Sequence, residues 1–221
     1  LGLLIYSVFR ARRLAYRAQD HLREKVARDF HDELGSKLTI ITLYSELTRQ
    51  VISAEAEPAQ QYLGKISRTA AEAYGSMKDL IWSLNPAEDT LEDLGQRLQV
   101  AAQELFEEAE IDYEVEVLSG DKRQELPPDF KRHVLLIFKE AMHNALRHSN
   151  CTEVCLRFEQ RNSFLQVSLQ DNGRGFDSGA SLQGEGLMNM KNRARQLGGD
   201  LQIRSSELGT RVLLRCRWPA R

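Results

Sequence analysis

Three polar side chains at four-residue spacing are the first candidates for chemistry in this sequence. Glu140, Asn144 and His148 stand at positions i, i+4 and i+8, so on an α-helix they lie on one face. The amide oxygen of Asn144 is a hard ligand that suits Mg²⁺, and a carboxylate and an imidazole beside it can orient phosphate or water. A polar stripe of this kind also fits an ordinary solvated helix. It therefore indicates a magnesium–polyphosphate site only together with other motifs.

Two glycine-containing segments follow this stripe. Asp171-Asn-Gly-Arg-Gly175 comes directly after an alternating strand pattern, and Gly184-Glu-Gly186 comes directly before a helical pattern. An aspartate at a strand end can accept hydrogen bonds from an exocyclic amine while glycines let the backbone approach a flat ring. Glycines before a helix let backbone amides meet phosphate at the positive end of the helix. Each motif alone is weak evidence, since Asp-Asn-Gly is also an ordinary turn sequence.

A histidine with acidic neighbours lies in the first part of the chain, within Ala27-Arg-Asp-Phe-His-Asp-Glu-Leu-Gly35. A carboxylate next to His31 can keep one imidazole nitrogen protonated and leave the other as a nucleophile. Asp32 is the first candidate for this carboxylate, and Glu33 is the second. A single histidine on a charged helix is usually just solvated, so a role for His31 depends on the rest of the chain.

The residues around and after His31 have helical patterns. Residues 12–52 contain no proline, a turn is expected around 53–58, and Asn85-Pro86 ends a second helix. In that second helix, apolar residues recur at alternating three- and four-residue steps, which is the seam of a coiled coil or four-helix bundle. The seam consists of Leu63, Ile66, Ala70, Ala73, Met77, Leu80 and Leu84. Two helices cannot bury this seam alone, so we expect a hairpin that forms a dimeric four-helix bundle. An intramolecular bundle is the alternative, but few helices remain to supply it.

Helical and strand patterns alternate after Pro86. Helices are predicted over 91–109, 130–148 and 187–197, and strands over 113–117, 154–158, 165–169, 201–203 and 212–214. Val134, Phe138, Ala141 and Ala145 share one apolar face of the long central helix. This order of helices and mostly antiparallel strands predicts a two-layer α/β sandwich. The predicted fold class is therefore α plus α/β, with a helical hairpin followed by the sandwich.

Composition narrows the possible functions. The 221 residues are enough for two small domains, and the net charge of −2 argues against direct binding of nucleic acid. Cys151, Cys155 and Cys216 have no spacing typical of a zinc site, so we interpret them as structural thiols in a reducing cytoplasm.

The first nine residues are almost wholly apolar and are followed by Arg10, Arg12 and Arg13. This segment is shorter than the roughly 20 residues that span a bilayer. A signal peptide would carry its positive charges before the apolar segment rather than after it. We therefore expect residues 1–11 to be the end of a transmembrane helix of the inner membrane, with the rest of the chain on the cytoplasmic side. An apolar terminus of a soluble protein is the alternative.

In this order and on these elements, the three downstream motifs resemble the N, G1 and G2 boxes of the GHKL ATPases, a group that includes DNA gyrase and the histidine kinases. The resemblance covers about residues 91–217 and implies the GHKL (Bergerat) fold, with ATP and Mg²⁺ as cofactors. It implies that Asp171 binds the adenine amine, that Glu140 and Asn144 hold Mg²⁺, and that residues 173–186 are a mobile lid. The residues that it places at the nucleotide are Asn144, Arg147, His148, Asp171, Gly173, Gly175, Gly184, Gly186, Leu187 and Thr210. A P-loop sequence, GxxxxGK[ST], is absent.

The segment around His31 resembles the phosphoacceptor box of sensor histidine kinases related to the nitrate sensors and the DesK-type thermosensor, and Trp82-Ser-Leu-Asn-Pro86 resembles the helix end of the same group. The resemblance implies a homodimeric kinase of a two-component system that phosphorylates His31 with help from Asp32 and Glu140. The phosphoryl group would then pass to an aspartate on the receiver domain of a response regulator. A GHKL-type serine kinase (anti-sigma factor) and a non-catalytic dimeric scaffold are the alternatives.

The resemblance also suggests how the chain divides. The expected parts are the end of a transmembrane helix (1–11), a signalling coiled-coil linker (12–30), a dimerisation and phosphotransfer domain (22–86), and an ATP-binding catalytic domain (91–217). One position departs from the family pattern. Ser36 stands where family members that also dephosphorylate their partner carry an amide side chain, so the sequence leaves phosphatase activity open.

Overall fold

The computed structural model describes residues 34, 36–51, 57–119, 125–161, 163–176 and 184–218. The predicted membrane segment (1–11), the predicted linker (12–30), and His31 with Asp32 lie outside the described residues. The chain divides into two compact units, residues 1–87 and residues 88–221.

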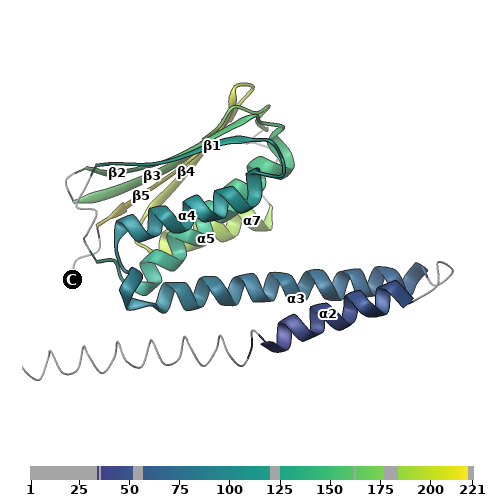
Figure 1. Ribbon diagram of the computed structural model, residues 1–221. Coiled ribbons are helices and arrows are strands. Elements are labelled where there is room, and N and C mark those ends of the chain that lie inside the picture. Colours follow the sequence, from purple (N-terminus) through teal and green to yellow (C-terminus); the bar gives the residue numbers. More distant parts are fainter. Residues whose placement is uncertain are drawn as a thin grey trace, which may run out of the picture. The chain divides into compact units, whose positions relative to one another are not determined.

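The first unit contains the predicted hairpin. Helix α2 (Ser36–Val51) packs against the longer helix α3 (Glu57–Leu84), as Figure 1 shows. Pro58 is the second residue of α3, a position where a missing backbone N–H costs little. The helix ends at Leu84, and the Asn85 amide donates to the Trp82 carbonyl oxygen at 3.1 Å. The predicted end of the helix at Asn85-Pro86 is confirmed, whereas the turn expected around residues 53–58 falls mostly on residues 52–56, outside the described residues.

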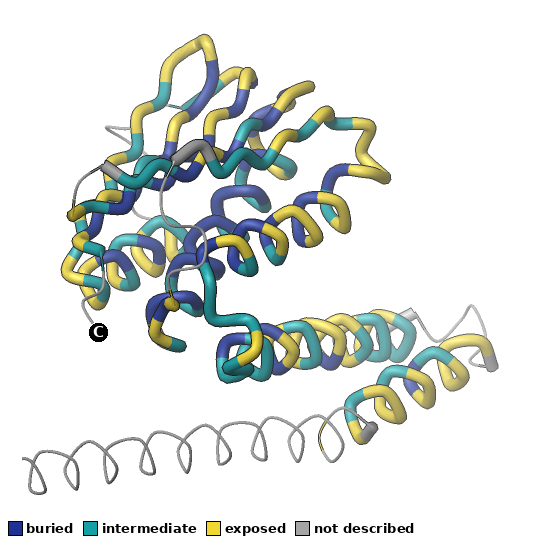
Figure 2. Tube along the Cα trace, turned by 60° about the vertical axis from the view of Figure 1, so that its left-hand side comes forward, coloured by how far each residue is buried: buried dark blue, intermediate teal, exposed yellow. Residues whose placement is uncertain are grey.

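The seam of α3 is only partly covered within one chain. Ala70 and Met77 are buried, but Ile66 keeps 46% of its surface exposed. Further large apolar side chains are exposed on both helices: Ile40, Ile41, Leu43, Tyr44, Leu47 and Tyr62. In Figure 2 the exposed and intermediate colours accordingly dominate this hairpin. A single hairpin therefore leaves apolar surface in water, as expected for two helices alone. Over the part of the chain that is described, helices long and apolar enough to cross a bilayer are absent.

The second unit is a two-layer α/β sandwich, as predicted. Its five strands are β1 (Asp112–Ser119), β2 (Glu153–Arg161), β3 (Phe164–Asp171), β4 (Asp200–Ser206) and β5 (Gly209–Arg217), in the spatial order β1-β2-β3-β5-β4. Strands β1 and β2 pair in parallel, and the other pairs are antiparallel. Helices α4 (Leu91–Phe106), α5 (Pro128–Asn144) and α7 (Glu185–Gln196) cover one face of this sheet (Figure 1).

The core of this unit lies between the sheet and the helices. Val134, Phe138, Ala141 and Ala145 of the central helix are all buried, as their spacing predicted. The strands contribute every second side chain, because successive residues of a strand point to opposite faces. The buried strand residues are Val154, Leu156, Phe158, Leu165, Val167, Leu169, Val212 and Leu214. This packing of the strands against the helices fixes the position of the strand ends, and therefore the position of the motif residues that follow them.

Several helix boundaries differ by a few residues from the sequence-based expectation; α5 ends at Asn144 rather than 148, and α7 begins at Glu185 rather than 187. Helix α4 ends at Phe106 rather than 109, and Glu110 has a positive φ of 54° in the turn that follows. The residues after Phe106 include Glu107, Glu108 and Glu110, and carboxylates are unfavourable at the negative end of a helix. The central helix begins earlier than expected, at Pro128, because a proline fits the first turn.

Candidate active site

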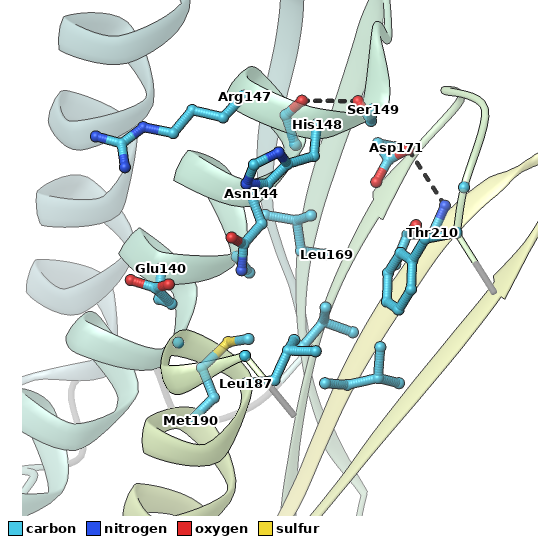
Figure 3. Close-up of a pocket in the computed structure, with 18 of the residues that line it drawn as sticks. Glu140, Asn144, Arg147, His148, Ser149, Leu169, Asp171, Leu187, Met190 and Thr210 are labelled. Atoms are coloured by element: carbon cyan, nitrogen blue, oxygen red, sulfur yellow. Dashed lines mark hydrogen bonds between the residues drawn. The ribbon is translucent and has the colours of Figure 1, made fainter. Parts of the chain in front are cut away.

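The polar stripe predicted from the sequence lines a single cavity. Helix α5 contributes Glu140 and Asn144, and a wider helical turn after it (Ala145–Ser149) contributes Arg147 and His148. The cavity has a volume of about 600 Å³, and Figure 3 shows these side chains around it. The apolar face of the same helix is buried, and the polar stripe next to it lines the cavity together with Ala141 and Ala145 of the apolar face.

Asp171 lies at the end of β3 with only 3% of its surface exposed. Its Oδ1 accepts hydrogen bonds from the backbone amides of Gly173 at 2.9 Å and Thr210 at 3.2 Å. Figure 3 shows the second of these bonds. Burial raises the pKa of Asp171 above its ordinary value, and the two amide hydrogen bonds oppose this shift. Since both hydrogen bonds end on Oδ1, they do not use Oδ2, which can accept from a donor in the cavity.

The glycines next to Asp171 permit close backbone contacts. A Cβ on Gly173 would lie 2.6 Å from the Ser149 Cβ and still closer to its carbonyl oxygen. Gly175 has a φ of +61°, and a Cβ there would meet the Ser206 carbonyl oxygen. Gly209, with a φ of +115°, lies against the Asp171 backbone in the same way. These positions exclude any side chain, so the loop after β3 and the turn before β5 can close on the carboxylate.

The start of α7 approaches the central helix at Gly186. A Cβ on this residue would overlap the Glu140 Oε1 and lie 3.0 Å from the Glu140 Cδ, whereas Gly184 has open space around it. Gly184 stands at the N-cap in an extended conformation. Backbone amides at a helix N-terminus carry a partial positive charge, which suits an anionic ligand. The second glycine of the motif therefore allows this positive end to lie beside the Glu140 carboxylate.

Most of the predicted nucleotide residues line this one cavity. They are Glu140, Asn144, Arg147, His148, Asp171, Gly175, Gly184, Gly186, Leu187 and Thr210. Gly173 is not among the lining residues and instead donates its amide to Asp171. The interior of the expected lid, residues 177–183, lies outside the described part of the chain.

The apolar walls of the cavity were not predicted. Leu169, Ile203 and Val212 come from three different strands, and Met190 comes from α7. Leu169 stands two residues before Asp171, and Val212 two residues after Thr210, so the period-2 rule places each pair on one face of the sheet. The period-2 rule could have identified these residues as facing the same side as the motif residues. By itself it does not distinguish a residue in a cavity wall from a residue in the core. These side chains form apolar surfaces of the kind that a flat ring requires.

Two further polar residues, also missed from the sequence, hold the loop after β3. The Asn172 Oδ1 accepts from the amides of Thr152 at 2.9 Å and Glu153 at 3.0 Å. The Ser205 Oγ accepts from the Phe176 amide at 2.7 Å and lies 3.1 Å from the Thr210 Oγ1. Hydrogen bonds to neighbouring strands therefore fix both ends of the Asp171–Phe176 segment.

The cavity thus combines three kinds of surface. A buried carboxylate with apolar walls suits a base that carries an amino group, and the cations Arg147 and Arg174 with the N-terminus of α7 suit phosphate groups. The oxygens of Glu140 and Asn144 are the hard ligands that Mg²⁺ prefers. The residues present fit a nucleoside polyphosphate with a divalent cation.

Two protein-family models match the chain, one in each unit. A model described as "Histidine kinase" matches residues 23–89, and a model described as "Histidine kinase-, DNA gyrase B-, and HSP90-like ATPase" matches residues 130–220. Together they cover well over half of the chain. The order of the two is the order expected from the motifs.

Similar proteins with known names agree with these models. Over 192 residues, the chain is 28% identical to the sensor protein VraS of Staphylococcus haemolyticus and 27% identical to the sensor histidine kinase LiaS of Bacillus subtilis. Each match covers 86% of this chain, and 53% and 52% of the respective relatives. The chain therefore spans about half the length of the curated relatives it matches.

Solved structures show the same fold. The Acinetobacter baumannii histidine kinase AdeS superposes with a TM-score of 0.56 at 13% identity, covering 86% of this chain and 98% of the other. The blue-light activated histidine kinase EL346 of Erythrobacter litoralis superposes with a TM-score of 0.55 at 19% identity, covering 84% of this chain and 60% of the other. A helical region followed by a GHKL-type sandwich is thus the architecture of known histidine kinases. With both family models in order and named sensor kinases among its relatives, the chain belongs to the sensor histidine kinases of two-component systems.

Proposed function

We propose that this chain binds ATP in the cavity of the second unit, phosphorylates His31, and passes the phosphoryl group to an aspartate on the receiver domain of a response regulator. The observation that carries the proposal is that Glu140, Asn144, Asp171 and the N-terminus of α7 line one cavity. The match of residues 23–89 to a histidine kinase model supplies the phosphoacceptor. That match does not favour a serine kinase or a scaffold.

The base and the phosphates of ATP occupy different ends of the cavity in this proposal. The exocyclic amine of adenine donates to the Asp171 Oδ2, and the ring lies between the apolar walls near Thr210. Arg147, His148 and the backbone amides of residues 184–187 receive the phosphates, because the guanidinium is a cation and the imidazole and the amides offer N–H donors. Leu187 closes the apolar side at the start of α7.

The ligands for a magnesium ion in this proposal are Glu140 and Asn144. Both offer oxygen atoms on the same face of α5, one turn apart, which is the donor chemistry that Mg²⁺ requires. When bound, Mg²⁺ would supply charge neutralisation at the phosphates. The carboxylate of Glu140 also stands where it can orient the γ-phosphate.

Phosphoryl transfer then consists of one in-line displacement. The unprotonated imidazole nitrogen of His31 attacks the γ-phosphorus, the P–N bond forms, and the bond between the γ-phosphorus and the bridging oxygen of ADP breaks. Asp32 takes the proton from the other imidazole nitrogen, so that the products are ADP, protonated Asp32, and a phosphohistidine whose ring is uncharged and whose phosphoryl oxygens are anionic. Positioning and charge stabilisation do most of the work in this class of reaction.

The proposed protein acts as a homodimer attached to the inner membrane. The exposed apolar side chains of α2 and α3 support the dimer, because burial of such surface is favourable. The apolar residues 1–9, followed by arginines, support a membrane attachment with the catalytic units on the cytoplasmic side.

Incubation with ATP labelled at the γ-phosphate tests the proposal. We expect label that is stable in alkali and labile in acid, that disappears in His31→Gln, and that persists in the control His21→Gln. Label that survives in His31→Gln would contradict the phosphoacceptor assignment. Alkali-labile, acid-stable label would point to a serine kinase instead.

A further inference from the structure

One face of the sheet in the second unit carries charges of opposite sign on its two halves. Helices α4, α5 and α7 all lie on the other face (Figure 1), and we call the face opposite these helices the open face. Strand alternation identifies its side chains. Ile203 of β4 lines the cavity, so the neighbouring Arg204 points to the open face. Arg211 of β5 does the same beside Val212, which also lines the cavity.

The half of the open face formed by β4 and β5 is positively charged at one end. Arg204 and Arg211 are exposed and are paired with each other in the antiparallel register. Like charges directly opposite one another destabilise a sheet. Further along the same strands, Arg215 is paired with Asp200, and its guanidinium lies 4.6 Å from the centre of the Phe164 ring. The positive charge is therefore unbalanced only where the two arginines stand together.

The half formed by β1 and β2 is an acidic counterpart. Tyr113 contacts a ring on α4, so the neighbouring Asp112 points to the open face. Asp112 and Glu153 are exposed and are paired in the parallel register. Further along these strands, the Arg157 Nε lies 2.5 Å from the Glu116 Oε2, which balances the charge there. Here the unbalanced charge is negative, and again it lies at one end.

Both like-charged pairs lie at the same end of the sheet. Val154, which follows Glu153, is paired with Asp171 on β3, and Gln170 is paired with Arg211. The two pairs therefore both stand near Asp171, and they are separated across the sheet by about 14 Å, at about 4.8 Å per strand. This separation exceeds the screening length of about 8 Å at physiological ionic strength. The two pairs therefore do not neutralise each other within one chain.

We propose that the open face is a self-association surface, on which the second unit pairs with a second copy of itself. A two-fold axis parallel to the strands and above β3 places β4 and β5 of one copy over β1 and β2 of the other, and it keeps the two Asp171 ends together. The Arg204–Arg211 pair of each copy then meets the Asp112–Glu153 pair of the other. A two-fold axis perpendicular to the strands would place each half over itself. The charge pattern therefore selects the first arrangement.

The central strand suits a position on the axis, because a residue there meets its own copy. The residues of β3 on the open face are all uncharged: Phe164, Gln166, Ser168 and Gln170. Five strands of about eight residues span roughly 24 Å by 26 Å, so the pairing covers on the order of 600 Å² on each copy. This is the lower range for specific interfaces, and it indicates a weak contact that is effective between copies held close together. The cavity lies on the helix side, so the pairing goes beyond the proposed function and does not depend on nucleotide binding.

A thiol cross-linker tests the geometry in the full chain. Gln166→Cys with Cys155→Ser places a thiol at the axis, and the other two cysteines are buried. Packed sheets lie about 10 Å apart, so a bis-maleimide of about that reach should join the two copies. The matched control is Gln202→Cys with Cys155→Ser, because residue 202 on β4 would face β1 of the other copy rather than its own copy. We expect cross-linking to be at least about tenfold faster at 166 than at 202. Equal rates would overturn the inference.

Charge reversal tests the pairing itself, with Gln166→Cys and Cys155→Ser present throughout. Arg204→Glu with Arg211→Glu makes the charged end wholly acidic, and Asp112→Arg with Glu153→Arg makes it wholly basic. Each variant alone should cross-link at least about tenfold more slowly, because the two-fold axis repeats every contact. When the two are co-expressed, the mixed product, identified by its mass, should form at close to the original rate. Unchanged rates in the single variants, or a missing mixed product, would contradict the pairing.

The controls separate this surface from general effects of charge and folding. Lys191→Glu with Arg195→Glu reverses two charges on α7, on the other face, and should leave the cross-linking rate unchanged. Arg204→Lys with Arg211→Lys should retain most of the rate. The dissociation constant of ADP should equal that of wild type in every folded variant. If a reversed variant does not fold, salt decides the question. Cross-linking at 166 should slow at least about tenfold between about 0.02 M and 0.5 M NaCl, because screening weakens exposed ion pairs. A rate independent of salt would overturn the inference.

Discussion

At the scale of single residues, Asp171 is the group whose chemistry depends most on its surroundings. Its pKa is raised, chiefly by burial. The folded chain therefore binds a proton at Asp171 more readily than the unfolded chain does. By linkage, the stability contributed by the protonated form is lost as the pH rises through the raised pKa. Adenine binding requires the opposite form, since an ionised carboxylate is the better acceptor.

We expect acidification to weaken ADP binding at a higher pH than an ordinary aspartate would cause. Calorimetric titrations of ADP into wild type and Asp171→Asn, between neutral and mildly acidic pH, measure how the affinity depends on pH. The variant should bind about 10- to 100-fold more weakly, from the loss of a charged hydrogen bond worth about 1.5–3 kcal/mol. The pH dependence of ADP binding that remains in Asp171→Asn comes from the phosphate groups of ADP. The difference between the wild-type and variant affinities at each pH therefore reports the protonation of Asp171. Identical curves would remove Asp171 from the adenine site.

The two glycines at the start of α7 provide a second comparison at this scale. An added methyl group at Gly186 would displace the Glu140 carboxylate, whereas one at Gly184 would meet open space. We expect Gly186→Ala to lower the affinity for ATP in the presence of Mg²⁺ about tenfold, equivalent to about 1.4 kcal/mol, and to have a smaller effect without the metal. Gly184→Ala is the control and should resemble wild type in both titrations. Equal effects of the two variants would separate Glu140 from the metal site.

The polar residues of the cavity could be predicted because each stands at a motif position with a recognisable spacing. Leu169, Ile203, Val212 and Met190 could not, since an apolar side chain at a cavity wall looks the same in sequence as one in the core. Ser205 and Asn172 were missed for another reason. Each has a partner 20 or more residues away along the chain, Thr152 for Asn172 and Phe176 for Ser205, and local patterns do not predict such pairs.

At the scale of elements, helix α5 connects three features of the second unit: the buried ion pair of Lys131 with Asp89, the core and the cavity. The spacing of its apolar residues predicts that this segment is a helix and where it lies in the sequence. The other helices, and the strand pairs joined by short turns, can be predicted from their spacing in the same way. The order of strands in the sheet does not follow from local patterns. Strands β1 and β2 pair in parallel with α5 between them in sequence, and β5 lies between β3 and β4. Both arrangements depend on contacts between distant segments.

The ion pair between the Lys131 Nζ and the Asp89 Oδ1, 2.6 Å apart, affects the stability of this unit. In Lys131→Met alone, Asp89 would keep a charge without its closest partner, and its side chain is only 13% exposed. Breaking one half of a buried pair typically costs about 3–5 kcal/mol, whereas replacing both halves costs much less. We expect urea unfolding to show this difference between the single variant and the double variant with Asp89→Asn. Arg157→Met should change the stability far less, because that pair is more exposed and is screened by solvent. A single variant as stable as the double one would mean that the pair is not coupled.

At the scale of the whole molecule, the two units have different tasks in the proposed function. The residues that line the cavity all belong to the second unit, whereas the exposed apolar side chains Ile40, Ile41, Leu43 and Ile66 belong to the first. Association and nucleotide binding should therefore respond to different substitutions.

We expect Ile66→Glu to weaken the dimer by more than tenfold in sedimentation velocity experiments and to leave ATP affinity unchanged. The reason is that each buried isoleucine contributes about 1.5–3 kcal/mol, and a symmetric dimer buries two copies. Val100→Glu is the control, because Val100 is similarly exposed, at 43%, but lies on α4 outside the hairpin. A dimer unaffected by Ile66→Glu would place the interface elsewhere on the chain.

The close packing of Gly173, Gly175 and Gly209 around Asp171 bears on how this site could evolve under selection by an inhibitor. A Cβ at any of these positions would overlap backbone atoms of Ser149, Ser206 or Asp171. Resistance to a competitive compound usually requires a neighbouring side chain that grows or changes shape. At Gly173, Gly175 and Gly209 there is no room even for a methyl group. At these three positions, a substitution that blocks a compound bound beside Asp171 would therefore also disrupt the backbone packing that holds this carboxylate.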